Sequence, residues 1–373
     1  MTPPLRSPRM VVDLSALRDN LALVRHCAGP REVIASIKAN AYGLGVVGIA
    51  QALVDAGVEK LWTGNPDEAV ALREAGITAQ ILLFGGVRPK HFPVLLAYDL
   101  QPTLFEDQSA ELLAAAALAA GKRARVWVKV DAGLGRLGVP LEQAGAFIRR
   151  LASEPALELR GVYTHLPFAS QDGRAWAIDR YSAFKQLTVD LAQSGVSIPV
   201  TQAWGSSGLL SGAPDSSTAV CVGHALYGLS PLTPELASRK ELKPLVKSLS
   251  ADIIRVDYAT ESTSQAGGYA LSKRRRPATV AIGLGDGLRP AASGHSARVI
   301  AGGRCVPVAA FTLEHLMIDL GGENCAALFD QATIVGRVGH AEITLDDWAH
   351  WTGASPLELM MSLSGRIPVV HEE

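Results

Sequence analysis

The sequence has little charge, few cysteines and no long uninterrupted apolar segment. Of its 373 residues, 19% are charged and four are cysteines, and the formal net charge is −1. Cys27, Cys221, Cys305 and Cys325 are far apart and form no CxxC pair, which argues against a disulfide framework or a zinc site. A nearly neutral chain offers little attraction to a polyanion, so we expect no nucleic-acid partner.

Charged residues and prolines interrupt every apolar run, although hydrophobic residues make up 48% of the chain. No run reaches the roughly 18–20 residues of a membrane span, so we expect no membrane association. Residues 1–10 contain three prolines and lack the apolar centre of a signal peptide. Together with the scattered cysteines, these features predict a cytoplasmic protein.

Strand-like and helix-like segments alternate from about residue 30 to residue 230. Such alternation indicates parallel strands joined by crossover helices, and about eight units within roughly 200 residues are typical of a (β/α)8 barrel. We therefore predict a TIM-type barrel over residues 12–235. The expected strands lie at 33–37, 60–63, 80–84, 125–130, 157–163 and 200–203, with shorter segments near 94–100 and 219–226.

The pattern changes near residue 235. Short β-rich segments follow, separated by glycine-rich turns such as GLGDG at residues 283–287, and helical sequence returns near 344–363. This pattern predicts a mostly-β C-terminal domain, formed by residues 236–373 together with residues 1–11. The GLGDG segment lacks the GxGxxG spacing of a dinucleotide-binding loop, so we expect it to be a turn.

One helix start inside the expected barrel is well marked. Asn65 is a suitable N-cap residue, Pro66 occupies the first helical position, and Glu68 stands three residues after the cap. This spacing predicts a capping box, in which the Glu68 carboxylate accepts a hydrogen bond from the Asn65 backbone N–H.

The most informative segment is residues 33–45, VIASIKANAYGLG. An apolar, strand-like run ends at Lys38, and a turn of small residues follows at once. Burial at such a strand end would lower the pKa of the lysine and make its amine a usable nucleophile or base. A solvated loop lysine is the alternative interpretation, because most lysines are exposed.

Other polar residues follow the later expected strands in the same way. Arg136 lies in DAGLGRLG at residues 131–138, His165 follows the 157–163 strand, and Ser206 follows the 200–203 strand. Gly223 and His224 come directly after an apolar run. The C-terminal ends of barrel strands build the active site in this fold, so we expect these groups to meet there.

These segments resemble the alanine racemase family over nearly the whole chain. The resemblance implies that Lys38 holds pyridoxal 5'-phosphate (PLP) as a Schiff base. It further implies that Tyr42, Ser206 and the backbone near Gly223 and His224 contact the cofactor phosphate.

The resemblance also assigns roles near the substrate. Arg136 would lie near the phenolic oxygen of the cofactor and bind the substrate carboxylate, and Lys129 matches a lysine that is often carbamylated and orients this arginine. His165 matches a histidine in the hydrogen-bond chain behind the second catalytic base. The family further implies a homodimer with shared active sites, in which the β domain of one chain closes the barrel of the other.

The chain departs from the family at several positions. Cys221 replaces the arginine that contacts the pyridine nitrogen, and Gln265 replaces the tyrosine that serves as the second base. Tyr269 is close to Gln265 and could take its role if the loop is re-registered. Leu313 and Glu314 replace a Met-Asp pair that approaches the substrate carboxylate.

These departures leave three hypotheses for the function. Glutamine does not titrate near neutral pH, so Gln265 cannot supply a proton on the face of the substrate opposite Lys38. The chain could be a racemase of a small amino acid with a rebuilt second base, a PLP-dependent lyase or aldolase that uses one base, or a non-catalytic PLP-binding protein. The sequence does not identify the amino acid.

Overall fold

A computed structural model describes residues 6–236, 241–257, 276–321, 325–363 and 365–373. The chain forms two compact units. One comprises residues 16–41 and 46–243, and the other comprises residues 1–15, 42–45 and 244–373. The larger unit is a parallel β-barrel and the smaller unit is mostly β, as the sequence predicts.

The barrel consists of eight parallel strands that close into a ring. Their order is β2-β3-β4-β5-β6-β8-β9-β10, and β10 pairs with β2 while β5 pairs with β6. A short strand, β7 (Val139–Pro140), pairs with β6 outside the ring. The ring strands are β2 (Glu32–Ser36), β3 (Lys60–Thr63), β4 (Gln80–Leu83), β5 (Leu100–Leu104), β6 (Ala124–Asp131), β8 (Leu157–Tyr163), β9 (Thr201–Gln202) and β10 (Ala219–Val222).

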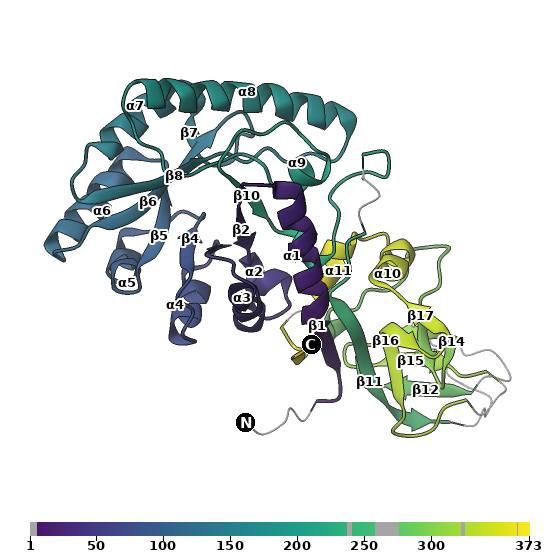
Figure 1. The fold of residues 1–373 in the computed structure, drawn as a ribbon. Helices are drawn as coiled ribbons and strands as arrows, with labels where there is room; N and C mark the ends of the chain where they lie inside the picture. The colour runs from purple at the N-terminus through teal and green to yellow at the C-terminus, as the bar shows by residue number, and fades with distance from the viewer. Residues whose placement is uncertain (1–5, 237–240, 258–275, 322–324, 364) are drawn as a thin grey trace. The chain divides into compact units, whose positions relative to one another are not determined.

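Helices follow the barrel strands and form an outer layer around them (Figure 1). The apolar stripe of each main helix is buried; α7, for example, buries Ala144, Phe147, Ile148 and Leu151. The helices are α1 (Leu14–Ala28), α2 (Lys38–Tyr42), α3 (Val46–Asp55), α4 (Pro66–Glu74), α5 (Phe92–Ala97), α6 (Asp107–Ala119), α7 (Leu141–Ala152), α8 (Gln171–Gln193) and α9 (Ser206–Leu210), with short 3₁₀ turns at Pro89–His91 and His224–Tyr227.

A layer of large side chains fills the barrel interior. Its members are Ile34, Trp62, Leu82, Trp127, Tyr163 and Ala219. The Trp62 ring meets the Tyr163 ring edge-on with centroids 4.4 Å apart, and the Trp127 indole N–H donates to Gln101 Oε1 at 2.8 Å. A side chain at Gly161 would place its Cβ 2.2 Å from the Trp127 ring, so glycine makes room for the indole there.

The smaller unit is built around a nine-stranded sheet whose order is β17-β16-β13-β14-β15-β12-β11-β1-β18. The N-terminal strand β1 pairs antiparallel with β11 and parallel with β18, which explains why the first residues belong to this unit. The elements are β1 (Arg9–Asp13), β11 (Val246–Val256), β12 (Pro277–Val280), β13 (Arg298–Ala301), β14 (Arg304–Phe311), β15 (Leu316–Asp319), β16 (Gln331–Val338), β17 (Ala341–Ile343), β18 (Val369–Glu372), a 3₁₀ turn at Leu284–Asp286, α10 (Leu345–Thr352) and α11 (Pro356–Ser362).

The GLGDG segment forms the expected turn. Its 3₁₀ turn ends at Gly287, whose φ of 94° requires glycine. Asp286 is buried there and binds Arg6, with an Oδ1–Nη1 distance of 2.7 Å.

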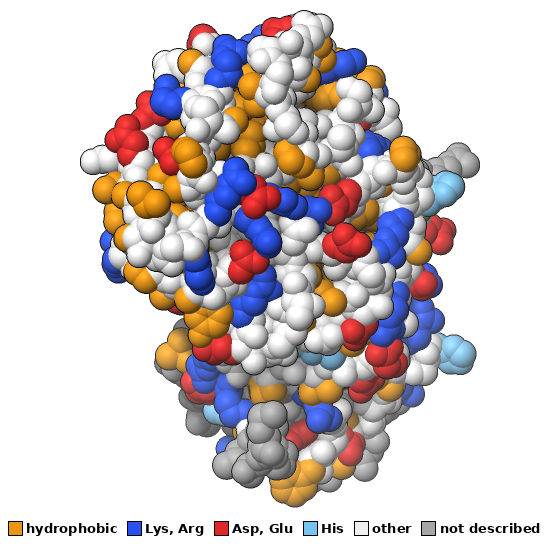
Figure 2. Space-filling view, turned by 60° about the vertical axis from the view of Figure 1, so that its left-hand side comes forward, with side chains coloured by type: hydrophobic (Ala, Val, Ile, Leu, Met, Phe, Trp, Pro, Cys, Tyr) orange, Lys and Arg blue, Asp and Glu red, His pale blue; other side chains and the backbone are white. Residues whose placement is uncertain are grey.

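Basic and acidic side chains are intermixed on the surface. On the face drawn in Figure 2, Lys and Arg side chains lie beside Asp and Glu side chains and do not gather in a patch of one sign. Within the described residues, no helix is both long and apolar enough to cross a membrane.

Candidate functional site

Lys38 stands at the C-terminal end of β2, at the start of an unusual turn. Ala39, Asn40, Ala41 and Tyr42 all have left-handed backbone conformations, with φ between 53° and 56°. Left-handed backbone is costly for residues other than glycine, by about 1–2 kcal/mol per residue. Strained backbone of this kind clusters at functional sites, so the turn marks the lysine as more than a loop residue.

The layer above the barrel core carries the polar groups. Side chains alternate along a strand, so Lys129, His165 and Cys221, each two residues after a core residue, point the same way as the core layer and lie nearer the C-terminal ends of the strands. Lys38 lies two residues after the end of β2, within electrostatic range of Cys221 and Arg136. The barrel therefore brings these predicted residues to one mouth.

The Lys38 amine is half-buried and lies within electrostatic range of Cys221 and Arg136. Burial lowers the pKa of the Lys38 amine, the field of Cys221 opposes this, and the Arg136 charge lowers it further. Burial raises the pKa of the Cys221 thiol to about 12, against the opposing effect of Lys38. The thiol is therefore neutral at physiological pH.

The loop that carries Arg136 is organised by Asp131. Its carboxylate accepts hydrogen bonds from the backbone N–H groups of Gly133 at 2.9 Å, Leu134 at 2.8 Å and Gly135 at 2.9 Å. Burial raises the pKa of Asp131, but these backbone donors lower it more, so the carboxyl stays ionised. The sequence placed Asp131 in the Arg136 segment, but it gave no sign that this residue shapes the loop.

Lys129 and His165 face the same positive field. Burial, and then the Arg136 charge, lower the pKa of Lys129 to about 8. Burial lowers the pKa of His165 to about 3, with further lowering by Arg136, Lys129, Lys38 and His224. The side chains that lower the pKa of His165 are all basic, so they would stabilise an anion bound among them.

Within the barrel unit, Ser206 lies beside the turn that contains Gly223 and His224. Ser206 is buried, and its hydroxyl accepts a hydrogen bond of 3.2 Å from the backbone N–H of Ala225. This bond joins the start of α9 to the turn that contains Gly223 and His224. Burial and the Lys38 charge lower the pKa of His224 to about 4, which keeps this imidazole neutral. Tyr42, at the end of the left-handed turn, is also buried, and it belongs to the smaller unit.

Only some of the candidate residues of the C-terminal unit are among the residues that the structure describes. Gln265 and Tyr269 lie outside the described residues. Leu313 stands between β14 and β15, and 70% of it is exposed. Its neighbour Glu314 binds Arg366, with an Oε2–Nη2 distance of 2.9 Å.

The expected capping box of α4 is not formed. Asn65 does cap the helix, because its Oδ1 accepts from the Asp67 N–H at 2.9 Å, and Pro66 begins it. Glu68, however, accepts from the Asn40 N–H at 2.8 Å and from the Thr63 hydroxyl at 2.5 Å. The prediction was wrong at Glu68, because the turn after Lys38 provides a competing donor that local sequence cannot reveal.

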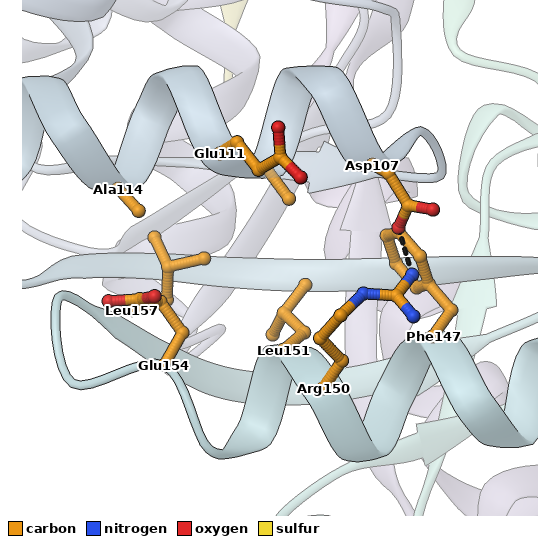
Figure 3. Close-up of a pocket in the computed structure, with 9 residues that line it drawn as sticks. Asp107, Glu111, Ala114, Phe147, Arg150, Leu151, Glu154 and Leu157 are labelled. Atoms are coloured by element: carbon orange, nitrogen blue, oxygen red, sulfur yellow. Dashed lines mark hydrogen bonds and ion pairs between the residues drawn. The ribbon is translucent and has the colours of Figure 1, made fainter.

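A separate groove lies on the outside of the barrel, between α6 and α7 (Figure 3). Its volume is about 70 Å³. Arg150 and Asp107 form an ion pair at one end, and Leu151 and Leu157 line the floor. It contains none of the strand-end residues described above, so we do not assign the candidate site to it.

The fold and the strand-end residues define a class of protein. It is a (β/α)8-barrel enzyme with a lysine of lowered pKa in a basic mouth, followed by a mostly-β domain. The mouth combines a nucleophilic amine with buried hydroxyl and backbone donors. This donor set fits a cofactor that carries both an aldehyde and a phosphate.

Comparison with known proteins gives the family. The family model "Alanine racemase, N-terminal domain" matches residues 12–231, and "Alanine racemase, C-terminal domain" matches residues 246–371. An alanine racemase from Synechocystis is 33% identical over 361 residues, 96% of each chain. One from Symbiobacterium thermophilum is 30% identical over 358 residues, 96% of this chain and 95% of the other. The chain belongs to the alanine racemase family.

Solved structures agree with this assignment. An alanine racemase from Bacillus anthracis with bound L-Ala-P superimposes with a TM-score of 0.88 at 28% identity, covering 100% of this chain and 96% of the other. One from the D-cycloserine producer Streptomyces lavendulae gives 0.88 at 28% identity, covering 99% and 98%. The family depends on PLP, and PLP is therefore the cofactor of this chain.

Proposed function

We propose that the chain acts at the Cα of a small amino acid and that Lys38 is both its cofactor lysine and its base on one face of the substrate. The observation that carries this proposal is the Lys38 amine, half-buried at the barrel mouth with a lowered pKa and with Arg136 and Cys221 within electrostatic range. PLP, when bound, supplies the sink for negative charge at Cα. A neutral amine can take and return the proton there.

The other groups of the mouth would bind and orient. Arg136 is suited to the substrate carboxylate, because a guanidinium binds carboxylates in a bidentate manner. Ser206, the backbone near Gly223 and the Tyr42 hydroxyl are suited to the cofactor phosphate. His165 stays neutral down to about pH 3, so it can donate or accept hydrogen bonds without adding charge.

A second candidate function is one-base lyase or aldolase chemistry, and Cys221 favours it. By the family resemblance, the thiol would take the position of the arginine that contacts the pyridine nitrogen. Burial keeps this thiol neutral, since its pKa is about 12. A fixed positive charge there limits delocalisation of negative charge into the cofactor ring, and a neutral thiol removes that limit.

The test is solvent-deuterium exchange at Cα, measured for a panel of D- and L-amino acids and for β-hydroxy amino acids. Exchange with inversion supports a racemase, and exchange without inversion or with aldehyde release supports one-base chemistry. If no amino acid in the panel exchanges its Cα proton, both the racemase and the one-base proposal are contradicted, and a non-catalytic PLP-binding protein is favoured.

Lys38→Ala is the matched variant for this experiment. We expect it to abolish both Cα exchange and borohydride-dependent attachment of PLP. If a Lys38→Ala protein still fixes the cofactor at one stoichiometric lysine, the assignment of Lys38 is wrong.

A further inference from the structure

The turn after Lys38 needs support from outside its own sequence. Ala39, Asn40, Ala41 and Tyr42 form a left-handed turn, and none of them is glycine. A local backbone bond, from the Ala41 N–H to the Ile37 carbonyl at 2.9 Å, closes the first part of the turn. L-residues disfavour left-handed helix, so other contacts must stabilise it.

Two contacts to Asn40 supply part of this support. The Asn40 backbone N–H donates to Glu68 Oε1 at 2.8 Å. The Asn40 side chain in turn accepts from the Val46 N–H at 2.8 Å, which caps the start of α3. Asn40 thereby links the lysine turn to α3 on one side and to α4 on the other.

Glu68 is itself held on its second oxygen. The Thr63 hydroxyl, fully buried at the end of β3, donates to Glu68 Oε2 at 2.5 Å. The Asn65 N–H donates to Thr63 Oγ1 at 3.3 Å. A chain of hydrogen bonds therefore runs from the end of β3, through Glu68, to the residue two positions after Lys38.

The position of Glu68 argues for a function beyond helix formation. It occupies the place of a capping-box glutamate, where it would normally accept from the Asn65 N–H. Its oxygens bind Asn40 and Thr63 instead. Asp67, its exposed neighbour in the same first turn, is already suited to complement the helix dipole. A residue that departs from the local rule is a candidate for a functional one.

We propose that Glu68 is a positioning residue, whose carboxylate fixes the left-handed turn and so sets the direction of the Lys38 amine. The proposal rests on the proposed function of Lys38 as the cofactor lysine. It predicts that the loss of Glu68 acts on cofactor attachment more than on folding.

The experiment compares Glu68→Ala, Glu68→Gln and Asp67→Ala with the natural protein. Glutamine retains an oxygen for the Asn40 N–H, so it should restore most of what alanine loses. Asp67→Ala removes the same charge from the same helix turn without touching Asn40. The measurements are the apparent affinity for PLP, the pH dependence of borohydride-fixed PLP on Lys38, and the thermal unfolding midpoint.

We expect Glu68→Ala to bind PLP roughly five- to twentyfold more weakly, because it loses a hydrogen bond to a charged acceptor at a partly exposed site. Its labelling profile should move to higher pH, since a relaxed turn lets water reach the amine and restores its ordinary basicity. Glu68→Gln and Asp67→Ala should stay within about twofold of the natural protein.

A lower unfolding midpoint in Glu68→Ala with unchanged PLP affinity and labelling profile would overturn the proposal, because it would show a purely structural role. An equal loss of PLP affinity in Asp67→Ala would overturn it too, since the effect would then come from removing negative charge from the first turn of α4. If Lys38 in the natural protein fixes no PLP, the proposed function itself fails, and this outcome is distinct from either of the others.

Discussion

His165 is held neutral by its surroundings to an unusual degree. Burial is the main cause, and the basic groups Arg136, Lys129, Lys38 and His224 add to it, so the pKa falls to about 3. A histidine in an unfolded chain titrates near 6.5. Between these two values the unfolded state binds more protons than the folded state, and acid therefore favours unfolding.

The free energy of unfolding of the cofactor-free protein should fall as the pH drops from about 6.5 towards about 4. We expect His165→Asn to reduce this dependence by on the order of 1–2 kcal/mol, because asparagine has no proton to gain. Urea unfolding across this range measures the effect. His295→Asn is the control, since His295 is exposed and far along the chain from the barrel. Parallel curves for the natural protein and His165→Asn would contradict the prediction.

Alanine racemisation should be weak compared with that of ordinary family members, even with PLP fully bound. Reprotonation on the face opposite Lys38 needs a group that carries a proton, and the family resemblance assigns this position to Gln265, which carries none. Loss of one acid or base typically costs about 10²–10⁴-fold. The rate of L-to-D alanine conversion tests this, and we expect Gln265→Tyr to raise it. Robust conversion by the natural protein that Tyr269→Phe abolishes would show that Tyr269 is the second base.

At the scale of elements, the left-handed turn inverts the usual effect of glycine. Ala39 is exposed at φ 55°, where glycine carries no steric penalty. We expect Ala39→Gly to be neutral or to stabilise the protein. Ala115→Gly, at an exposed position inside α6, should instead cost about 1 kcal/mol. Thermal unfolding of both variants checks this, and an equal loss of stability in each would argue against the left-handed turn.

The sequence predicted the strands better than the connections between them. Two strands, β3 and β8, match their expected bounds, because apolar periodicity and turn residues define them. It also placed Lys38 at a strand end. It did not reveal the left-handed turn, since a run of residues other than glycine carries no signal for that backbone. The sequence also did not predict the hydrogen bond between Glu68 and Asn40. Asn40 is distant from Glu68 along the chain, and the capping-box rule predicts the Asn65 N–H as its partner instead.

At the scale of the whole molecule, we predict a homodimer with two shared active sites. The prediction comes from the family, and the exposed Leu313 at the tip between β14 and β15 is suited to contact a second chain. A two-fold dimer is also the commonest oligomer. Sedimentation at micromolar concentration should show twice the 39.3 kDa chain mass. A single species at the mass of one chain would count against it, and Leu313→Asp should weaken the dimer.

The aromatic layer of the barrel has an optical consequence. Trp62 and Trp127 lie with ring centroids 6.3 Å apart, directly beneath the layer that holds Lys38 and Lys129. The Trp62 indole N–H is buried with no hydrogen-bond partner among the described residues, so its fluorescence should be blue-shifted, like that of an indole in an apolar solvent. A cofactor bound to Lys38 would absorb at the long-wavelength edge of their emission and would partly quench them by energy transfer. The fold thus carries its own fluorescent reporter of cofactor loading, readable without any substrate.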